Sequence, residues 1–140
     1  NIWVLDISEK AIERAMKRLG EEKASKVHWI VSDVTEFIPE VLYDFWHDRA
    51  TFHFITTEEN IYKYVSIAED AISKDGYLIL GTFSENGPSK CSGLEVKQYS
   101  EASMSARFEI AFDRIKCIEE NHITPFNTIQ NFLFCSFKKK

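Results

Sequence analysis

Acidic side chains stand at the ends of short apolar runs in this 140-residue chain. Asp6 comes directly after residues 2–5, and Asp33 stands just beyond residues 27–31. Continuous apolar runs of this length are typical of strands that are buried on both faces of a parallel sheet. The carboxyl ends of such strands form the edge at which open α/β sheets bind ligands, and a carboxylate there can accept hydrogen bonds from both hydroxyls of a ribose. Asp6 and Asp33 therefore indicate a nucleotide-binding site.

Asp6 also has a purely structural explanation. Ser8 is a suitable N-cap for a helix whose apolar residues recur at helical spacing up to Leu19, and Gly20 is suited to end that helix. A carboxylate beside a helix start is stabilised by the helix dipole. The second acidic residue, Asp33, stands at a comparable strand end and favours the ligand-binding interpretation.

The elements that would position these residues alternate between strands and helices. Strands are expected at residues 2–5, 27–31, 43–47 and 77–80, and helices at residues 8–20, 56–73 and 101–107. The second helix is expected to start at Thr56 or Thr57, where Thr56 and Glu59 have the spacing of a capping box, and to stop at Asp75 and Gly76. This order predicts an α/β fold: a Rossmann-like three-layer sandwich with a mostly parallel sheet covered by helices on both faces.

The last third of the chain has a different pattern. Residues 114–123 and 130–137 are strand-like and flank a connection rich in turn formers, so we expect an antiparallel hairpin at one edge of the sheet. Residues 84–98 have no clear periodicity, which is typical of a functional or mobile loop. We find no domain boundary and expect residues 1–140 to form a single, partial domain.

Composition excludes several classes of function. The chain has 17 Lys and Arg against 22 Asp and Glu, and its only basic cluster is at residues 138–140, so nucleic acid is not an expected partner. No apolar run is long enough for a membrane helix, so no membrane association is expected. Cys91, Cys117 and Cys135 are too scattered for a disulfide framework or a zinc site. We therefore expect no metal and a reducing, cytoplasmic compartment.

The order of these segments resembles the class I methyltransferases that use S-adenosylmethionine. The matching segments cover nearly the whole chain and are residues 4–8, 29–34, 43–49 and 75–83. Further segments look like a little-characterised subgroup of that family, and these are residues 48–54, 87–94 and 122–126. Each segment alone is a weak signal, but their order and spacing together are specific.

The resemblance implies S-adenosylmethionine as the cofactor and assigns its contacts. By match, Asp6 binds the ribose, and Asp33 accepts a hydrogen bond from the adenine amino group. Val34 offers its backbone to the adenine ring, while Ile7 packs on the face of that ring.

The chain departs from the family pattern at its beginning. The family's first strand and the glycine-rich turn after it, which lets the backbone approach the methionine part of the cofactor, have no counterpart in the sequence. In the family this strand is central, so the strands at residues 2–5 and 43–47 would each lose a neighbour. We expect an N-terminally truncated fragment with little activity of its own; re-pairing of the two strands is the alternative.

In the resembled family the end of the third strand faces the transferable methyl group. The catalytic candidates are therefore His53, Asp48 and Arg49. His53 is the candidate general base, because the ordinary pKa of histidine lies near neutrality; packing among its aromatic neighbours is the alternative. Arg49 could bind an acidic substrate or pair with Asp48 or Asp44.

The acceptor of the methyl group is not identified by the sequence and could be a small molecule or a protein. Cys91 could contact it but is not expected to act as a nucleophile, since this chemistry needs none. His122, Thr124 and Pro125 either line the acceptor pocket or only shape the hairpin. The oligomeric state is also open.

Two other functions stay open. One is an NAD-dependent oxidoreductase, because Asp6 would serve a dinucleotide ribose equally well. The other is a non-catalytic interaction module. Asp33 with Val34, and the expected C-terminal hairpin, favour methyl transfer.

Overall fold

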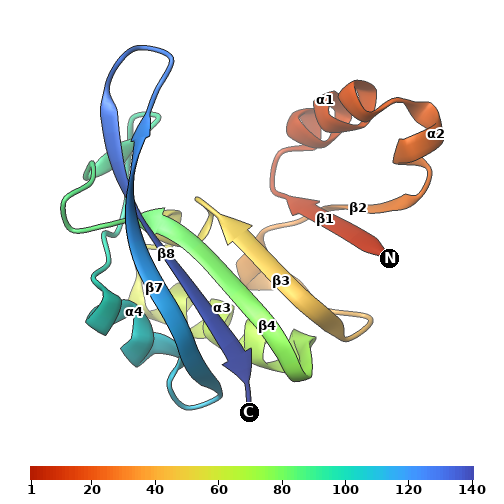
Figure 1. Cartoon of the computed structure of the whole chain (residues 1–140). Helices are drawn as coiled ribbons and strands as arrows, with labels where there is room; N and C mark the ends of the chain where they lie inside the picture. The colour runs from red at the N-terminus through yellow and green to blue at the C-terminus, as the bar shows by residue number, and fades with distance from the viewer. The chain divides into compact units, whose positions relative to one another are not determined.

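The computed structural model describes all 140 residues (Figure 1). Its strands are β1 (Ile2–Asp6), β2 (Val27–Val31), β3 (Tyr43–Arg49), β4 (Ile72–Phe83), β5 (Lys90–Cys91), β6 (Leu94–Glu95), β7 (Phe112–Ile123) and β8 (Ile129–Lys139). Its helices are α1 (Glu9–Leu19), α2 (Glu21–Ala24), α3 (Glu58–Ala71) and α4 (Glu101–Phe108), with 3-10 turns η1 (Val34–Glu36) and η2 (Phe52–Phe54). None of the helices has the length and apolar character needed to cross a membrane.

The chain divides into two compact units, Asn1–Ile38 and Pro39–Lys140. We call them unit 1 and unit 2 and describe each by itself. The expected α/β class is confirmed in both, because each unit combines a sheet with helices. The single domain over residues 1–140 stays a prediction.

Unit 1 is a parallel pair of strands joined by helices. β1 pairs with β2 in parallel, and α1 connects them as expected. Ser8 caps α1, since its side chain accepts a hydrogen bond from the Ala11 amide, and Gly20 ends the helix at a positive φ of 83°. The short helix α2 that follows was not expected from the sequence.

Unit 2 is built on a four-stranded sheet in the order β3-β4-β8-β7. β3 and β4 are parallel, whereas β8 is antiparallel to both β4 and β7. The expected antiparallel hairpin at the sheet edge is confirmed. The sheet of this unit is mixed, because only one of its three strand pairs is parallel.

The two faces of this sheet differ in burial. On β4, the side chains of Leu78, Leu80 and Thr82 are fully buried, and they alternate with Ile79 and Gly81 on the opposite face. The helices α3 and α4 contact β4, β7 and β8 and lie together behind the sheet in Figure 1. In unit 2 the helices therefore cover one face of the sheet, and on the other face Phe83 and Phe132 form a cluster with Val96.

β1 and β3 are among the strands that have a neighbour on one side only. β1 pairs with β2 alone and β3 pairs with β4 alone. These are the two strands that were expected to lose a neighbour.

The junction between α3 and β4 differs from the prediction. Of the two expected starts, Thr57 is the N-cap, because its side chain accepts the Asn60 amide. The helix ends at Ala71, and β4 begins at the next residue instead of at Tyr77. The pairing with β3 jumps from Ile72 to Tyr77, so the turn-forming residues between them form an irregularity inside the strand rather than a helix stop.

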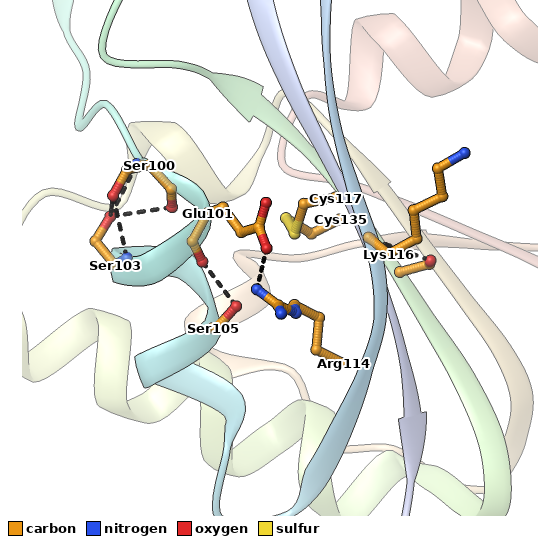
Figure 2. A network of polar contacts seen from close by, with 9 residues as sticks. Ser100, Glu101, Ser103, Ser105, Arg114, Lys116, Cys117 and Cys135 are labelled. Carbon is orange, nitrogen blue, oxygen red and sulfur yellow. Dashed lines mark hydrogen bonds and ion pairs between the residues drawn. A yellow bond between two sulfur atoms is a disulfide. The ribbon is translucent and has the colours of Figure 1, made fainter.

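An ion pair joins α4 to the C-terminal hairpin, and a disulfide joins the two strands of that hairpin to each other (Figure 2). α4 begins with a capping box of Ser100 and Ser103, and the next residue, Glu101, forms an ion pair with Arg114 of β7. Cys117 of β7 and Cys135 of β8 form a disulfide, with their Cα atoms 4.2 Å apart.

The disulfide corrects the prediction of a chain without one. The two cysteines are 18 residues apart in the sequence, but the hairpin register places Cys117 directly opposite Cys135. The third cysteine, Cys91, is a free thiol in the short β5 strand, within the segment expected to be a loop.

Candidate functional site

The two acidic residues predicted to bind a nucleotide lie at the same end of the β1–β2 pair. Asp6 is the last residue of β1 and is paired with Val31, and the Ser32 amide donates to the Asp6 carbonyl at 3.1 Å. Asp33 follows two residues after the end of β2. The parallel pairing thus brings to one edge two carboxylates that are 27 residues apart in the sequence.

Each carboxylate has one oxygen that is already used locally. Asp6 Oδ1 accepts the Ser8 amide at 2.8 Å, which supports the entry into α1. Asp33 Oδ1 accepts both the amide and the hydroxyl of Thr35, each at 2.8 Å, and so caps η1. The structural explanation of Asp6 and the ligand-binding one are compatible, because Oδ2 of each residue makes no hydrogen bond within the chain.

The two apolar candidates beside these carboxylates differ in exposure. Ile7 is 70% exposed, which is unusual for an isoleucine between a strand and a helix. Val34, by contrast, is buried in η1. An exposed apolar side chain next to two carboxylates gives a surface suited to a flat ring attached to a ribose.

Asp48 is buried and fully engaged. Its Oδ2 accepts the Tyr64 hydroxyl at 2.7 Å, and its Oδ1 accepts the Thr51 amide at 2.9 Å. Burial raises the pKa of the Asp48 carboxyl, and these hydrogen bonds oppose that rise. Asp48 therefore holds the turn that leads from β3 into η2 and connects it to Tyr64 of α3. It does not present a free carboxylate.

His53 lies in η2 and is completely buried. Its Nδ1 accepts the Phe83 amide at 3.3 Å, and its ring contacts the Phe83 ring with centroids 4.6 Å apart. A neutral imidazole that accepts at Nδ1 carries its proton on Nε2, so it has no free lone pair for a second proton. Burial lowers the pKa of His53 to about 4, which keeps the ring neutral. This geometry suits a positioning residue better than the predicted general base.

Arg49 lies at the end of β3, separated from the buried site of its neighbour Asp48. It is exposed, and its guanidinium has neither an ion pair nor a hydrogen bond within the chain, so the expected pairing with Asp48 or Asp44 does not form. Arg49 lines a cavity of about 330 Å³ in unit 2. The other residues of its lining are Glu120, Asn121, His122, Ile123, Phe132 and Phe134.

The hairpin residues expected near an acceptor separate into two groups. His122 lines the cavity together with Arg49, 73 positions earlier in the sequence. Thr124 shapes the turn instead, because its hydroxyl contacts the Thr128 hydroxyl at 2.7 Å and accepts the Thr128 amide at 3.2 Å. Cys91 packs against the cluster of Phe83, Val96 and Phe132 and does not line the cavity.

Sequence reasoning missed Glu120, Phe132 and Phe134 as parts of this cavity. A signal for them exists in the hairpin register, since Phe132 is paired with Glu120 and lies two residues from Phe134 on the same face. If the two hairpin strands are paired about their turn, Glu120 lies opposite Phe132. The pairing of β8 with β4, and of β4 with β3, then places Phe134 in the same row as Arg49.

Comparison with known proteins identifies the fold. No known protein family and no curated protein sequence matches the chain. Solved structures do match: the N-methyltransferase NodS of Bradyrhizobium japonicum, in complex with S-adenosyl-L-homocysteine, has a TM-score of 0.75 at 14% identity over 98% of this chain and 65% of its own. TehB of Haemophilus influenzae has a TM-score of 0.78 at 13% identity over 100% of this chain and 50% of its own.

A third neighbour is the 1,6-didemethyltoxoflavin N1-methyltransferase of Burkholderia thailandensis, with 1,6-didemethyltoxoflavin and S-adenosylhomocysteine bound. Its TM-score is 0.75 at 16% identity, over 99% of this chain and 60% of its own. The chain has the fold of the S-adenosylmethionine-dependent methyltransferases, as its resemblance implied. It spans between half and two thirds of the length of these three neighbours.

Proposed function

We propose that the protein takes part in methyl transfer from S-adenosylmethionine to a small-molecule or protein acceptor. The observation that carries the proposal is the pair of carboxylates, Asp6 and Asp33, at the same end of two parallel strands beside the exposed Ile7. Methyltransferase neighbours with S-adenosylhomocysteine bound support this choice of cofactor over NAD.

Each cofactor contact has a specific chemical role in this proposal. Asp6 accepts hydrogen bonds from the ribose hydroxyls, and its charge makes them stronger than neutral hydrogen bonds. Asp33 accepts the adenine amino group, Val34 presents its backbone to the ring edge, and Ile7 covers the face of the ring. The four residues together hold the adenosine half of the cofactor.

The methionine half needs a separate contact. The resemblance assigns it to a glycine-rich turn after a strand that pairs with both β1 and β3, and each of these strands has a free edge. The proposal therefore predicts that the residues of this chain contact adenosine alone, and that S-adenosylhomocysteine and adenosine bind to it with similar affinity.

Methyl transfer from a sulfonium is an in-line displacement that depends chiefly on alignment of donor and acceptor. In this proposal His53 and Asp48 are positioning residues, since both hold η2 in place behind the end of β3. Arg49 is the candidate that touches the substrate.

The cofactor site is tested by calorimetric titration of S-adenosylhomocysteine, adenosine and NAD into the chain and two variants. Asp6→Asn keeps an oxygen for the Ser8 amide but loses the charge, so it should weaken adenosine binding at least about tenfold without unfolding α1. Asp70→Asn, at an exposed position of α3, is the matched control and should bind like the unchanged chain.

The outcomes separate the functions. Binding of adenosine that is weakened by Asp6→Asn and not by Asp70→Asn supports methyl transfer. Tight binding of NAD with weak binding of S-adenosylhomocysteine would replace it by an oxidoreductase, and no binding of any of the three would leave a non-catalytic module.

A further inference from the structure

We propose that the cavity between Arg49 and the β7–β8 hairpin binds a small aromatic acid, with the carboxylate on Arg49 and the ring on Phe132 and Phe134. All of its lining residues belong to unit 2. That this ligand is the methyl acceptor rests on the proposed function. That the cavity binds it does not depend on that function.

Arg49 supplies the anion-binding end. It is the only Arg or Lys in the lining, and no carboxylate of the chain pairs with it. A guanidinium binds a carboxylate through two parallel hydrogen bonds, which fixes the orientation of the ligand as well as its charge. An unpaired guanidinium at the wall of a cavity is therefore suited to a carboxylate ligand.

The floor beside Arg49 is aromatic because of a glycine. Arg49, Gly81 and Phe134 are paired in one row across β3, β4 and β8. A Cβ on residue 81 would lie 2.6 Å from Cε1 of Phe134, so the Phe134 ring occupies the space that any other residue would need. The phenyl ring can thus extend over β4 toward Arg49.

The second ring of the cavity lies parallel to the first. Phe132 and Phe134 have centroids 5.8 Å apart and an interplanar angle of 20°. Aromatic faces favour offset stacking with other flat rings, which contributes beyond the area that is buried. This surface prefers a planar ligand over a saturated one of the same size.

The hairpin wall supplies hydrogen-bond acceptors. Glu120 and His122 line it from β7, and the His122 ring stands edge-on to Phe132 with centroids 6.2 Å apart. The Glu120 carboxylate would repel a second anion, so this end of the ligand is a hydroxyl or amino donor. An aromatic acid with a hydroxyl or amino substituent matches Arg49, the two phenyl rings and the hairpin wall together.

The volume agrees with a single substituted ring. Small-molecule sites range from roughly 300 to 1,000 Å³, and this cavity, at about 330 Å³, lies at the lower end. A peptide segment or a nucleotide would need more space.

The test is a titration of the full chain with 4-hydroxybenzoate, followed by ¹H–¹⁵N NMR. Its methyl ester, which is neutral, and 4-hydroxycyclohexanecarboxylate, which is not planar, are the comparison probes. We expect shifts at residues 120–123 and 132–134 with 4-hydroxybenzoate, and at least about tenfold weaker binding of the ester, as the loss of a charged hydrogen-bonded pair predicts. The saturated acid should also bind more weakly.

Two variants complete the test. Arg49→Met should reduce the affinity for 4-hydroxybenzoate at least about tenfold, whereas Arg14→Met, at an exposed and unpaired arginine of α1, should leave it unchanged. Equal binding of acid and ester, equal binding by Arg49→Met, or shifts confined to other residues would each overturn the proposal. So would an absence of binding by all three probes.

Failure of this inference is distinguishable from failure of the proposed function. The acid is titrated without cofactor and reports on Arg49 in unit 2, while the adenosine titration reports on Asp6 in unit 1. Binding of the acid without binding of adenosine would keep the pocket and remove the methyltransferase assignment. Binding of adenosine without binding of the acid would do the reverse.

Discussion

His53 is completely buried, and its titration tests the effect of that burial. Its folded-state pKa of about 4 lies below the ordinary value of 6.5, so between these two values the unfolded chain binds more protons. Stability is therefore fully present above about pH 6.5 and is lost as the pH falls toward 4. The total loss from this residue is at most about 3 kcal/mol.

Replacement of His53 by Asn isolates this effect. Asn can accept the Phe83 amide in place of Nδ1 but does not titrate, so urea unfolding of His53→Asn should depend less on pH between 4 and 6.5. Asp48 titrates nearby with a raised pKa, and its contribution cancels because it is present in both proteins. His28→Asn, at an exposed position of β2 in unit 1, is the control. An unchanged pH slope in His53→Asn would show that the buried ring is not the cause.

At the scale of elements, Glu58 ties three segments of unit 2 together. It lies in the first turn of α3 and binds Arg107 of α4 through both oxygens, at 2.6 and 3.0 Å. Lys97, from the segment before α4, contacts the same carboxylate at 2.6 Å. The hydrogen bonds from Arg107, and then those from Lys97, lower the pKa of Glu58 to about 2.

We expect Glu58→Gln to lower the Tm by a few degrees, because exposed ion pairs contribute little singly and more as a network. A depressed carboxyl pKa gives stability that is present above the ordinary value of 4.5 and is lost as the pH falls through about 2. The difference from the unchanged chain should therefore be full at pH 7, shrink in 1 M salt and vanish near pH 2. Glu59→Gln, which breaks only the pair with Lys63, should have a smaller effect; equal effects would refute the network.

The elements were predictable where local signals decide them. Ser8 and Gly20 delimit α1 by local hydrogen bonding, and β2 has the predicted bounds. The α3–β4 junction was not predictable in this way, because β4 already begins at Ile72, whose partner Tyr43 is far away in sequence, and Asp75 and Gly76 lie in the irregularity that follows. Likewise Asp6 and Asp33 are recognisable from strand ends, but the Arg49 cavity depends on strand pairings far apart in sequence.

Across the whole molecule, the strands differ in how many neighbours they pair with. β4 and β8 have neighbours on both sides, while β1 and β3 have one neighbour each. In a strand with a single neighbour, alternate amides point away from it and bond to water. Amides that are hydrogen-bonded in the middle of a sheet open only with the larger unfolding events, whereas exposed ones exchange freely.

We therefore predict that hydrogen exchange, followed by NMR, is slowest along β4 and β8 and that in β3 and β1 every second amide exchanges rapidly. The exchange rates of β1 and β3 are the most informative, because a strand added at the free edge would protect the fast amides and leave the slow ones unchanged. Uniform protection along β3 would mean that another strand covers its free edge. If that strand came from a second copy of the chain, protection would fall on dilution, and if it came from within the chain, protection would be independent of concentration.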